Sequence, residues 1–248
     1  MAVTEPKDMV SAAMRRLRTI NPVRPAELSR HDGLAYALWL PDRAPLRGGV
    51  VILHGAGSCK ESHYDFSRAL LPLGIASISF DQRGHGESDG PMDGRAITDV
   101  NSMAELLAAR TGTPIVLRGS SMGGYLALIA ATHIKARAVI AICPASADGL
   151  RRSLRKGEHR FDADVEQLDP LLERHGDLHA IVGELEIPVL LLHAEGDEVV
   201  PVEHSREMAG HLRHPDSRLV VVPGGHHRSI QHDEELQALS TRFVERAI

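Results

Sequence analysis

The segment Arg118-Gly119-Ser120-Ser121-Met122-Gly123-Gly124 joins an apolar run, Ile115–Leu117, to a stretch rich in Leu, Ala and Ile, Met122–Ala131. It places the pattern Gly-x-Ser-x-Gly between a predicted strand and a predicted helix. Such a sharp turn pushes a serine hydroxyl out over the edge of a sheet, where it can act as a nucleophile. The glycines leave room for the turn and for close packing of the helix on the strand. Ser121 is therefore the candidate nucleophile.

The same pattern occurs a second time, as Gly86-Glu87-Ser88-Asp89-Gly90. Pro91 and Gly94 follow it, and both residues oppose an immediate helix. Ser88 is therefore predicted to be a loop residue without a catalytic role.

Six short apolar runs recur along the chain, and each is nearly continuous, which is typical of strands buried on both faces of a parallel sheet. They are Gly49–Leu53, Ile75–Phe80, Ile115–Leu117, Ala138–Ile142, Val189–Leu192 and Leu219–Val222. The segments between and after them have helical patterns, over Glu61–Leu71, Thr98–Ala109, Met122–His133, His204–Leu212 and Glu234–Ala247. This alternation predicts βαβ units, with helices on both faces of the sheet.

The N-terminal part of the chain does not follow this alternation. Ala26–Arg30 and Leu34–Leu40 flank His31-Asp32-Gly33, whose glycine suits a turn, and we expect a leading antiparallel hairpin. Before it, apolar residues at helical spacing from Val10 to Leu17 lie among arginines. They predict a short amphipathic helix packed on the domain, with binding to a membrane surface as the alternative.

Residues 145–187 lack a buried-strand pattern and are polar and helical in character. We interpret them as a small helical cap inserted within a single domain that comprises residues 1–248. The cap carries a basic cluster, Arg151, Arg152, Arg155 and Lys156. A solvated helix face explains this cluster, and contact with an anionic group of a substrate is the alternative.

The composition excludes several classes of protein. The chain has 248 residues, 43% of them apolar, and a formal net charge of -5, which opposes disorder and gives no reason to expect binding to nucleic acid. No apolar run is long enough to cross a bilayer, and the N-terminus has no apolar signal core. Cys59 and Cys143 form no disulfide framework. We therefore expect a cytoplasmic protein.

Motifs for bound metals and nucleotides are also absent from the sequence. It has no Cys-x-x-Cys, His-Glu-x-x-His, Gly-x-Gly-x-x-Gly or Walker phosphate loop, so we expect neither a metal nor another cofactor. His204, His211 and His214 lie on or beside one predicted surface helix, where solvated side chains explain them better than a metal cluster.

A serine hydroxyl needs a base, and the base needs an acid that orients it. Asp197 lies in the loop after Val189–Leu192 and is the candidate acid, while Glu195 and Glu198 are alternatives. After Leu219–Val222, a glycine-rich turn leads to two adjacent histidines, His226-His227, one of which is the candidate base. Serine, acid and histidine thus follow in the order that the elbow architecture requires.

The negative oxygen of a tetrahedral intermediate needs backbone N–H donors. One donor is expected from the residue after the nucleophile, Met122. The other is expected from the loop His54-Gly55-Ala56-Gly57-Ser58, where we assign it to Ala56. His54 is expected to hold this loop rather than to take part in catalysis.

These motifs together resemble the α/β-hydrolase family. The matching segments are His54-Gly55-Ala56-Gly57, Asp81–Ser88, Gly119–Gly124, Asp197–Pro201 and Gly224–His227. The resemblance implies the α/β-hydrolase fold: a mostly parallel sheet with a leading antiparallel hairpin, helices on both faces and a small helical cap. It also identifies the loop at Asp81 as a structural turn. The family's Gly-x-x-His pattern favours His227 as the base, whereas Gly-Gly-His would select His226.

Within this family the chain is most similar to esterases, monoacylglycerol lipases and serine aminopeptidase-like enzymes. We therefore expect a serine hydrolase that cleaves small-molecule carboxylic esters with small or medium acyl groups through Ser121, His227 and Asp197. A thioesterase or an acylaminoacyl-peptidase with the same triad is the alternative, and Tyr125 after the Gly-Gly pair is a feature of such peptidases. A non-catalytic ligand receptor is a third hypothesis.

Overall fold

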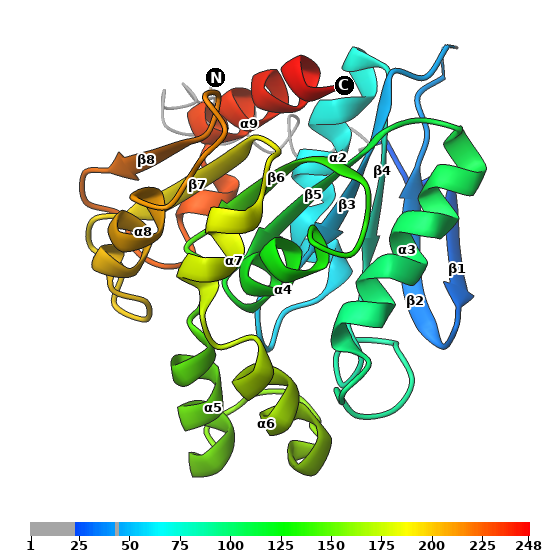
Figure 1. The fold of residues 1–248 in the computed structure, drawn as a ribbon. Coiled ribbons are helices and arrows are strands. Elements are labelled where there is room, and N and C mark those ends of the chain that lie inside the picture. Colours follow the sequence, from blue (N-terminus) through cyan, green and yellow to red (C-terminus); the bar gives the residue numbers. More distant parts are fainter. Residues whose placement is uncertain (1–22, 43–44) are drawn as a thin grey trace, which may run out of the picture.

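The computed structural model describes residues 23–42 and 45–248, and an eight-stranded sheet lies at its centre (Figure 1). The strands, in chain order, are β1 (Glu27–His31), β2 (Leu34–Trp39), β3 (Gly48–Leu53), β4 (Ile75–Phe80), β5 (Ile115–Ser120), β6 (Ala136–Ile142), β7 (Val189–Ala194) and β8 (Arg218–Val222). In the sheet they are arranged in the order β1-β2-β4-β3-β5-β6-β7-β8. The helix predicted from Val10 to Leu17 lies outside the described residues.

The sheet has the predicted mixture of strand directions. β1 and β2 form the antiparallel hairpin, whose turn residues Asp32 and Gly33 have φ angles of 52° and 78°. β2 pairs antiparallel with β4, and all pairings from β4 through β3 to β8 are parallel. The carboxyl ends of β3 and of β5 to β8 therefore lie at one edge of the sheet.

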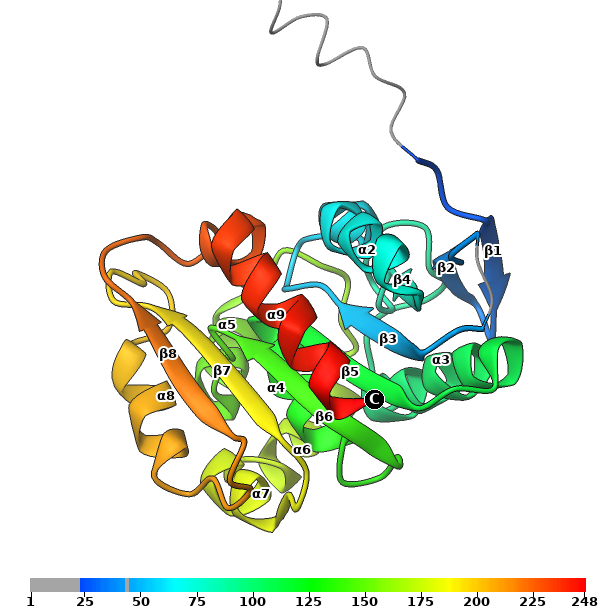
Figure 2. The same cartoon turned by 90° about the horizontal axis from the view of Figure 1, so that it is seen from above.

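Helices cover both faces of the sheet (Figure 2). One face carries α2 (Tyr64–Leu70) and α9 (Glu234–Ala247), and the other carries α3 (Ala96–Thr111), α4 (Met122–Ala130) and α8 (Val202–Ala209). The helix predicted over Glu61–Leu71 is observed as three consecutive elements: the 3₁₀ turn η1 (Lys60–His63), the helix α2, and the 3₁₀ turn η2 (Leu71–Leu73). Pro72 and Gly74, with its φ of 74°, end this segment.

The segment between β6 and β7 holds three helices, α5 (Ala147–Lys156), α6 (Val165–Arg174) and α7 (Leu178–Glu184). Each begins with a side-chain cap, from Ser146, Asp164 and Asp177 respectively. α5 and α6 project beyond one end of the sheet (Figure 1), whereas α7 packs against α4 and α8. Only the first two helices of residues 145–187 therefore stand apart from the layers.

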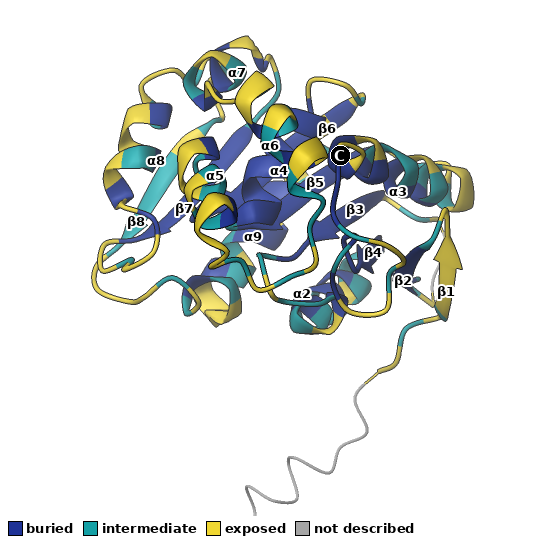
Figure 3. Ribbon diagram, turned by 90° about the horizontal axis from the view of Figure 1, so that it is seen from below, coloured by how far each residue is buried: buried dark blue, intermediate teal, exposed yellow. Residues whose placement is uncertain are grey.

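The connection from α5 to α6 is fastened to the rest of the domain. Backbone hydrogen bonds join Asp162 N–H to Gly84 O, Met92 N–H to Asp162 O, and Asp164 N–H to Met92 O, at 2.9–3.1 Å. The central strands are buried, whereas β1 and the outer surfaces of α5 and α6 are exposed (Figure 3). Within residues 23–42 and 45–248, no helix is long and apolar enough to span a membrane.

Candidate active site

Ser121 lies on a strained turn between β5 and α4. Its φ is 52° and its ψ is -119°, an arrangement that non-glycine residues rarely adopt. Its N–H donates to Ile142 O at 2.8 Å, and its carbonyl oxygen accepts from Tyr125 N–H and Ala145 N–H. The backbone is thus held on both sides, and Ser121 is half-buried at the edge of the sheet.

The neighbouring glycines allow this turn to pack closely. A Cβ at Gly119 would lie 2.1 Å from Gly123 O, and a Cβ at Gly123 would lie 2.4 Å from Leu53 O. Both distances are far inside van der Waals contact with backbone atoms. The requirement for glycine at these positions is therefore steric, as the sequence predicts.

Ser88, in the second copy of the pattern, has a different environment. Its hydroxyl donates to Asp81 O and accepts from Ala35 N–H. Both hydrogen-bonding roles of the hydroxyl are therefore used within the loop, in agreement with a structural role.

Asp197 and His227 lie in contact after adjacent strands, β7 and β8. Asp197 Oδ2 accepts from His227 Nδ1 at 2.7 Å, and Oδ1 accepts from Val199 N–H and Val200 N–H, each at 2.8 Å. The Asp197 side chain is fully buried, whereas 11% of the His227 side chain is exposed. The carboxylate is therefore fixed, and the imidazole is oriented with its Nδ1 inward.

Burial alone would raise the pKa of Asp197, but hydrogen bonds outweigh it. His193, His227 and the amides of Val200 and Val199 all donate to the carboxylate and hold its pKa well below the ordinary value. Asp197 therefore stays ionised at neutral pH, which is the state that orients and stabilises a protonated imidazole.

The rival residues have other partners. Glu195 pairs with Arg206 at 2.8 Å, and Glu198 accepts from the backbone N–H of His227 at 3.1 Å. His226 is exposed, and its backbone is tied to Ser229. Of the two adjacent histidines, His227 is therefore the one in contact with the carboxylate.

The backbone connects the nucleophile to this pair. Ser121 N–H is bonded to Ile142, and the next residue, Cys143, is bonded through its N–H to Leu192 O in β7. The ligand atoms of Cys143, Asp197 and His227 lie within 4.8 Å of one another. The end of β6 thus lies between the turn that carries Ser121 and the loops that carry Asp197 and His227.

This group of three is also the one set in the described part of the chain whose side chains are close enough to share a metal ion. A metal needs the thiolate, but burial raises the pKa of the Cys143 thiol well above its ordinary value. The Nδ1 of His227 is already engaged with Asp197. We interpret the three side chains as a carboxylate, the histidine bonded to it and a neighbouring buried thiol.

The loop after β3 lies directly against the nucleophile. A Cβ at Gly55 would lie 3.2 Å from the Cβ of Ser121. In the same loop, Gly57 N–H donates to His85 Nε2 at 3.0 Å. Among the described residues, the N–H groups of Ala56 and Met122 donate to no protein acceptor. Both amides are therefore available to a substrate oxygen.

His54 holds this loop, as the sequence predicts. Its Nδ1 lies 2.8 Å from Gly55 O, and its Nε2 accepts from Gln82 N–H at 3.0 Å. Burial, together with the nearby His85, lowers the pKa of His54 to about 4. His54 is therefore a neutral, structural histidine.

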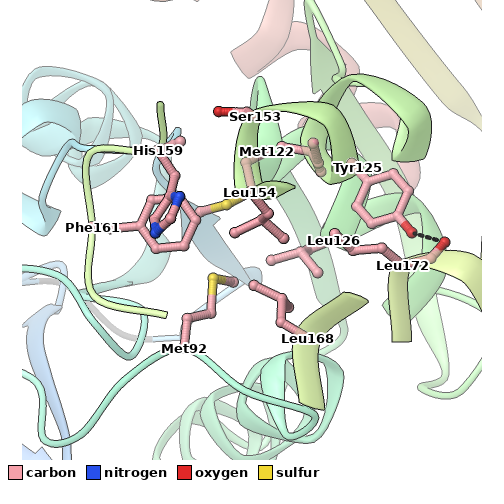
Figure 4. Close-up of a pocket in the computed structure, with 12 residues that line it drawn as sticks. Met92, Met122, Tyr125, Leu126, Ser153, Leu154, His159, Phe161, Leu168 and Leu172 are labelled. Carbon is pink, nitrogen blue, oxygen red and sulfur yellow. Dashed lines mark hydrogen bonds between the residues drawn. The ribbon is translucent and has the colours of Figure 1, made fainter. Parts of the chain in front are cut away.

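An apolar pocket lies between the cap and the two amides (Figure 4). The residues that line it include Ala56 and Met122 at the site, Met92, and Leu154, Phe161 and Leu168 of the cap. The pocket thus begins at the candidate oxyanion donors and continues beneath α5 and α6.

Tyr125 lines the pocket and directs its hydroxyl toward the cap. It is fully buried, and its hydroxyl donates to His175 O at 3.1 Å, with Leu172 O at 3.5 Å. Figure 4 shows it turned toward α6. Its position therefore indicates that it holds α4 to the cap.

The basic cluster on α5 is partly neutralised. Arg151 lies 2.9 Å from Asp169 and 3.1 Å from Glu173, and Arg155 lies 3.1 Å from Asp169. This pairing fits a solvated helix face more closely than an anion site.

Sequence reasoning missed three residues near the site. His193 lies 3.3 Å from Asp197 Oδ2, and Cys143 lies beside the same carboxylate. Phe161 of the cap stacks on His85, with 4.6 Å between ring centroids. The short spacing of His193 and Asp197 was the one available signal, since a turn after a strand can fold a side chain back on the strand's end.

The mostly parallel eight-stranded sheet with its antiparallel start and helices on both faces is the α/β-hydrolase fold. A family model described as serine aminopeptidase, S33, matches residues 44–161 and 160–235. The chain belongs to this family.

Individual relatives agree with this assignment. The chain is 25% identical over 248 residues to the monoacylglycerol lipase of Mycolicibacterium smegmatis, covering 82% of this chain and 88% of that protein. It is 33% identical over 183 residues to the mitochondrial palmitoyl-protein thioesterase ABHD10 of Mus musculus, covering 63% of this chain and 60% of the thioesterase. Alignments with two uncharacterized relatives from Salmonella span 63% of those proteins.

Among solved structures, a soluble variant of monoglyceride lipase from Saccharomyces cerevisiae matches with a TM-score of 0.71 at 18% identity, covering 92% of this chain and 96% of that chain. At this level of identity the similarity shows the fold alone, and it confirms the α/β-hydrolase architecture.

Proposed function

We propose that the protein is a serine hydrolase that cleaves carboxylic esters of small or medium acyl groups. The observation that carries the proposal is the buried, ionised Asp197 bonded to Nδ1 of His227, at the sheet edge where Ser121 is presented on a strained turn. The relatives support hydrolysis of an acyl bond, since they include a lipase and a thioesterase.

In the proposed mechanism, Ser121 Oγ attacks the ester carbonyl carbon while its proton passes to Nε2 of His227. Asp197 stabilises the resulting imidazolium, and the N–H groups of Ala56 and Met122 bind the negative oxygen. His227 then gives the proton to the departing alcohol. A water molecule attacks the acyl-enzyme with His227 as base, and the carboxylic acid leaves as the serine hydroxyl is restored.

The pocket supports an aliphatic acyl group. Its walls are mostly methionine, leucine and phenylalanine side chains, and it begins at the two amides that would bind the carbonyl oxygen. An acyl chain bound there would extend beneath the cap. A thioesterase is the second candidate, favoured by the 33% identity to ABHD10. Tyr125 lends no support to a peptidase because its hydroxyl is bonded to cap carbonyls.

The proposal is tested by labelling with a fluorophosphonate probe and by locating the adduct with peptide mass spectrometry. We expect one adduct, on Ser121. A parallel series of p-nitrophenyl esters with acyl chains of increasing length, beside acyl-CoA thioesters and aminoacyl anilides, ranks the substrate classes. Absence of labelling from the intact, folded protein would overturn the assignment and favour a non-catalytic receptor.

A further inference from the structure

A second histidine faces the carboxylate that orients the base. His193, the penultimate residue of β7, is fully buried. Its Nε2 lies 2.9 Å from Val200 O and 3.3 Å from Asp197 Oδ2, the same oxygen that accepts from His227. The mechanism above assigns His193 no part, although it contacts the candidate acid.

The surroundings of His193 determine which of its nitrogens carries the proton. Nε2 faces two oxygen atoms that can only accept, so it must be the donor. On the opposite side of the ring, Nδ1 lies 2.7 Å from the hydroxyl of the buried Ser205 in α8, which can donate to it. The Nε2–H of His193 is therefore directed at Val200 O and Asp197 Oδ2.

The contacts of His193 and Asp197 hold together the loop that carries Asp197. Asp197 Oδ1 binds the amides of Val199 and Val200, while His193 binds Val200 O and approaches Oδ2. The carboxylate therefore cannot rotate without breaking several contacts. A donor on Oδ2 also withdraws negative charge from the oxygen that stabilises the protonated His227.

We propose that His193 is a positioning residue that fixes the Asp197 carboxylate toward His227 and moderates its negative charge, an inference that rests on the proposed function. The other titratable groups that face this cluster are Cys143 at the end of β6, Glu198 and His226 in the adjoining loops, and His204 on α8. They are unchanged in the variants below.

Two amide substitutions at His193 distinguish the loss of its hydrogen bond to Asp197 from the loss of the volume that its ring fills. The amide of His193→Asn ends near the former Nδ1 position, close to Ser205, and loses the donor to Asp197. The amide of His193→Gln reaches the former Nε2 position and keeps a donor. Ser240→Ala, which removes another buried hydroxyl from the remote helix α9, is the control for packing loss.

For His193→Asn we expect kcat/KM on the preferred p-nitrophenyl ester to fall about tenfold. We also expect the acid limb of its pH profile to move upward by about half a pH unit. Without the His193 donor, Asp197 Oδ2 keeps more negative charge and makes His227 more basic. His193→Gln and Ser240→Ala should keep both within about twofold and about 0.2 unit of the wild type.

An equal loss in the Asn and Gln variants with an unmoved acid limb would show a purely structural residue and overturn the inference, as would wild-type kinetics in His193→Asn. If His193→Asn does not fold, the double variant His193→Leu/Ser205→Ala, which leaves no unpaired hydroxyl, is measured against the same expectations. A wild-type protein that neither labels nor hydrolyses esters would contradict the proposed function itself, which is a separate outcome.

Discussion

The two Gly-x-Ser-x-Gly segments share a sequence pattern and differ in every structural respect that matters to a nucleophile. Ser121 follows a buried strand and starts a helix, whereas Ser88 lies within a loop. The Ser88 hydroxyl is bonded to Asp81 O and Ala35 N–H, while Ser121 is anchored through its backbone instead. The elements on either side therefore decide whether a hydroxyl is used within a loop or presented at the sheet edge, as the proposed mechanism requires of Ser121.

The largest difference between the two segments should appear when each serine hydroxyl is removed in turn. Ser121→Ala should lower kcat for ester hydrolysis by about 10⁴-fold or more, since it removes the nucleophile. Ser88→Ala should leave kcat within about twofold and cost about 1–2 kcal/mol of unfolding free energy, because it leaves loop groups unpaired. Steady-state kinetics and urea unfolding measure both, and comparable losses of kcat would refute the distinction.

A second difference is that the proposed mechanism gives Ser121 a base, His227, which follows β8 at the same edge of the sheet, and gives Ser88 none. His227→Ala should reduce kcat/KM by about 10³-fold or more, because it removes the proton acceptor bonded to Asp197. His226→Ala provides the matched control, since this adjacent ring is exposed. Its kcat/KM should stay within about threefold of the wild type. The reverse result would exchange the roles of the two histidines.

The glycines of the two segments differ in the space around them. A Cβ at Gly123 would lie 2.4 Å from Leu53 O, whereas a Cβ at Gly90 would meet nothing within 4 Å. Gly123→Ala should therefore cost about 3 kcal/mol of unfolding free energy. Gly90→Ala should cost about 1 kcal/mol, from its φ of +69° alone. Urea unfolding distinguishes them, and similar midpoints for both variants would argue against a tightly packed elbow.

His54 connects the two regions, since it binds the start of the Asp81 loop and holds the loop beside Ser121. Its folded-state pKa of about 4 lies below the value of about 6.5 for an unfolded histidine. The unfolded chain therefore gains the proton first as pH falls below about 6.5, and stability decreases down to about pH 4. We expect His54 to contribute about 1 kcal/mol to the loss between pH 7 and pH 5.5.

Urea unfolding at pH 7 and pH 5.5 measures this contribution of His54 to stability. In His54→Gln the pH dependence should be weaker by that amount, because glutamine does not titrate. An unchanged dependence would mean that His54 is not the group responsible.

The comparison also shows what the sequence could predict. The strands β3 to β8 were foreseeable because each is a nearly continuous apolar run, and Ser121 because a strand precedes it and a helix follows. The position of α7 was not, since its packing against α4 and α8 depends on tertiary contacts that the polar composition of residues 145–187 conceals.

The contact between His193 and Asp197 was equally hidden. Residues four apart along an extended strand lie about 13 Å apart. Only the turn after Ala194 returns the carboxylate to the histidine, and that turn is specified by Gly196, which packs against Gly225 in the neighbouring loop. The adjacent His226 and His227 likewise required the structure, because their spacing suits either assignment. The cytoplasmic location stays a prediction.

The left-handed backbone of Ser121 has a consequence for the evolution of this chain. Only glycine adopts a φ of 52° with a ψ of -119° without strain, so the native state would be more favourable by about 1 kcal/mol with glycine there. Ser121→Gly is thus expected to yield a more heat-resistant but inert protein. The proposed function thus implies that the serine at this position serves turnover at the expense of thermal stability.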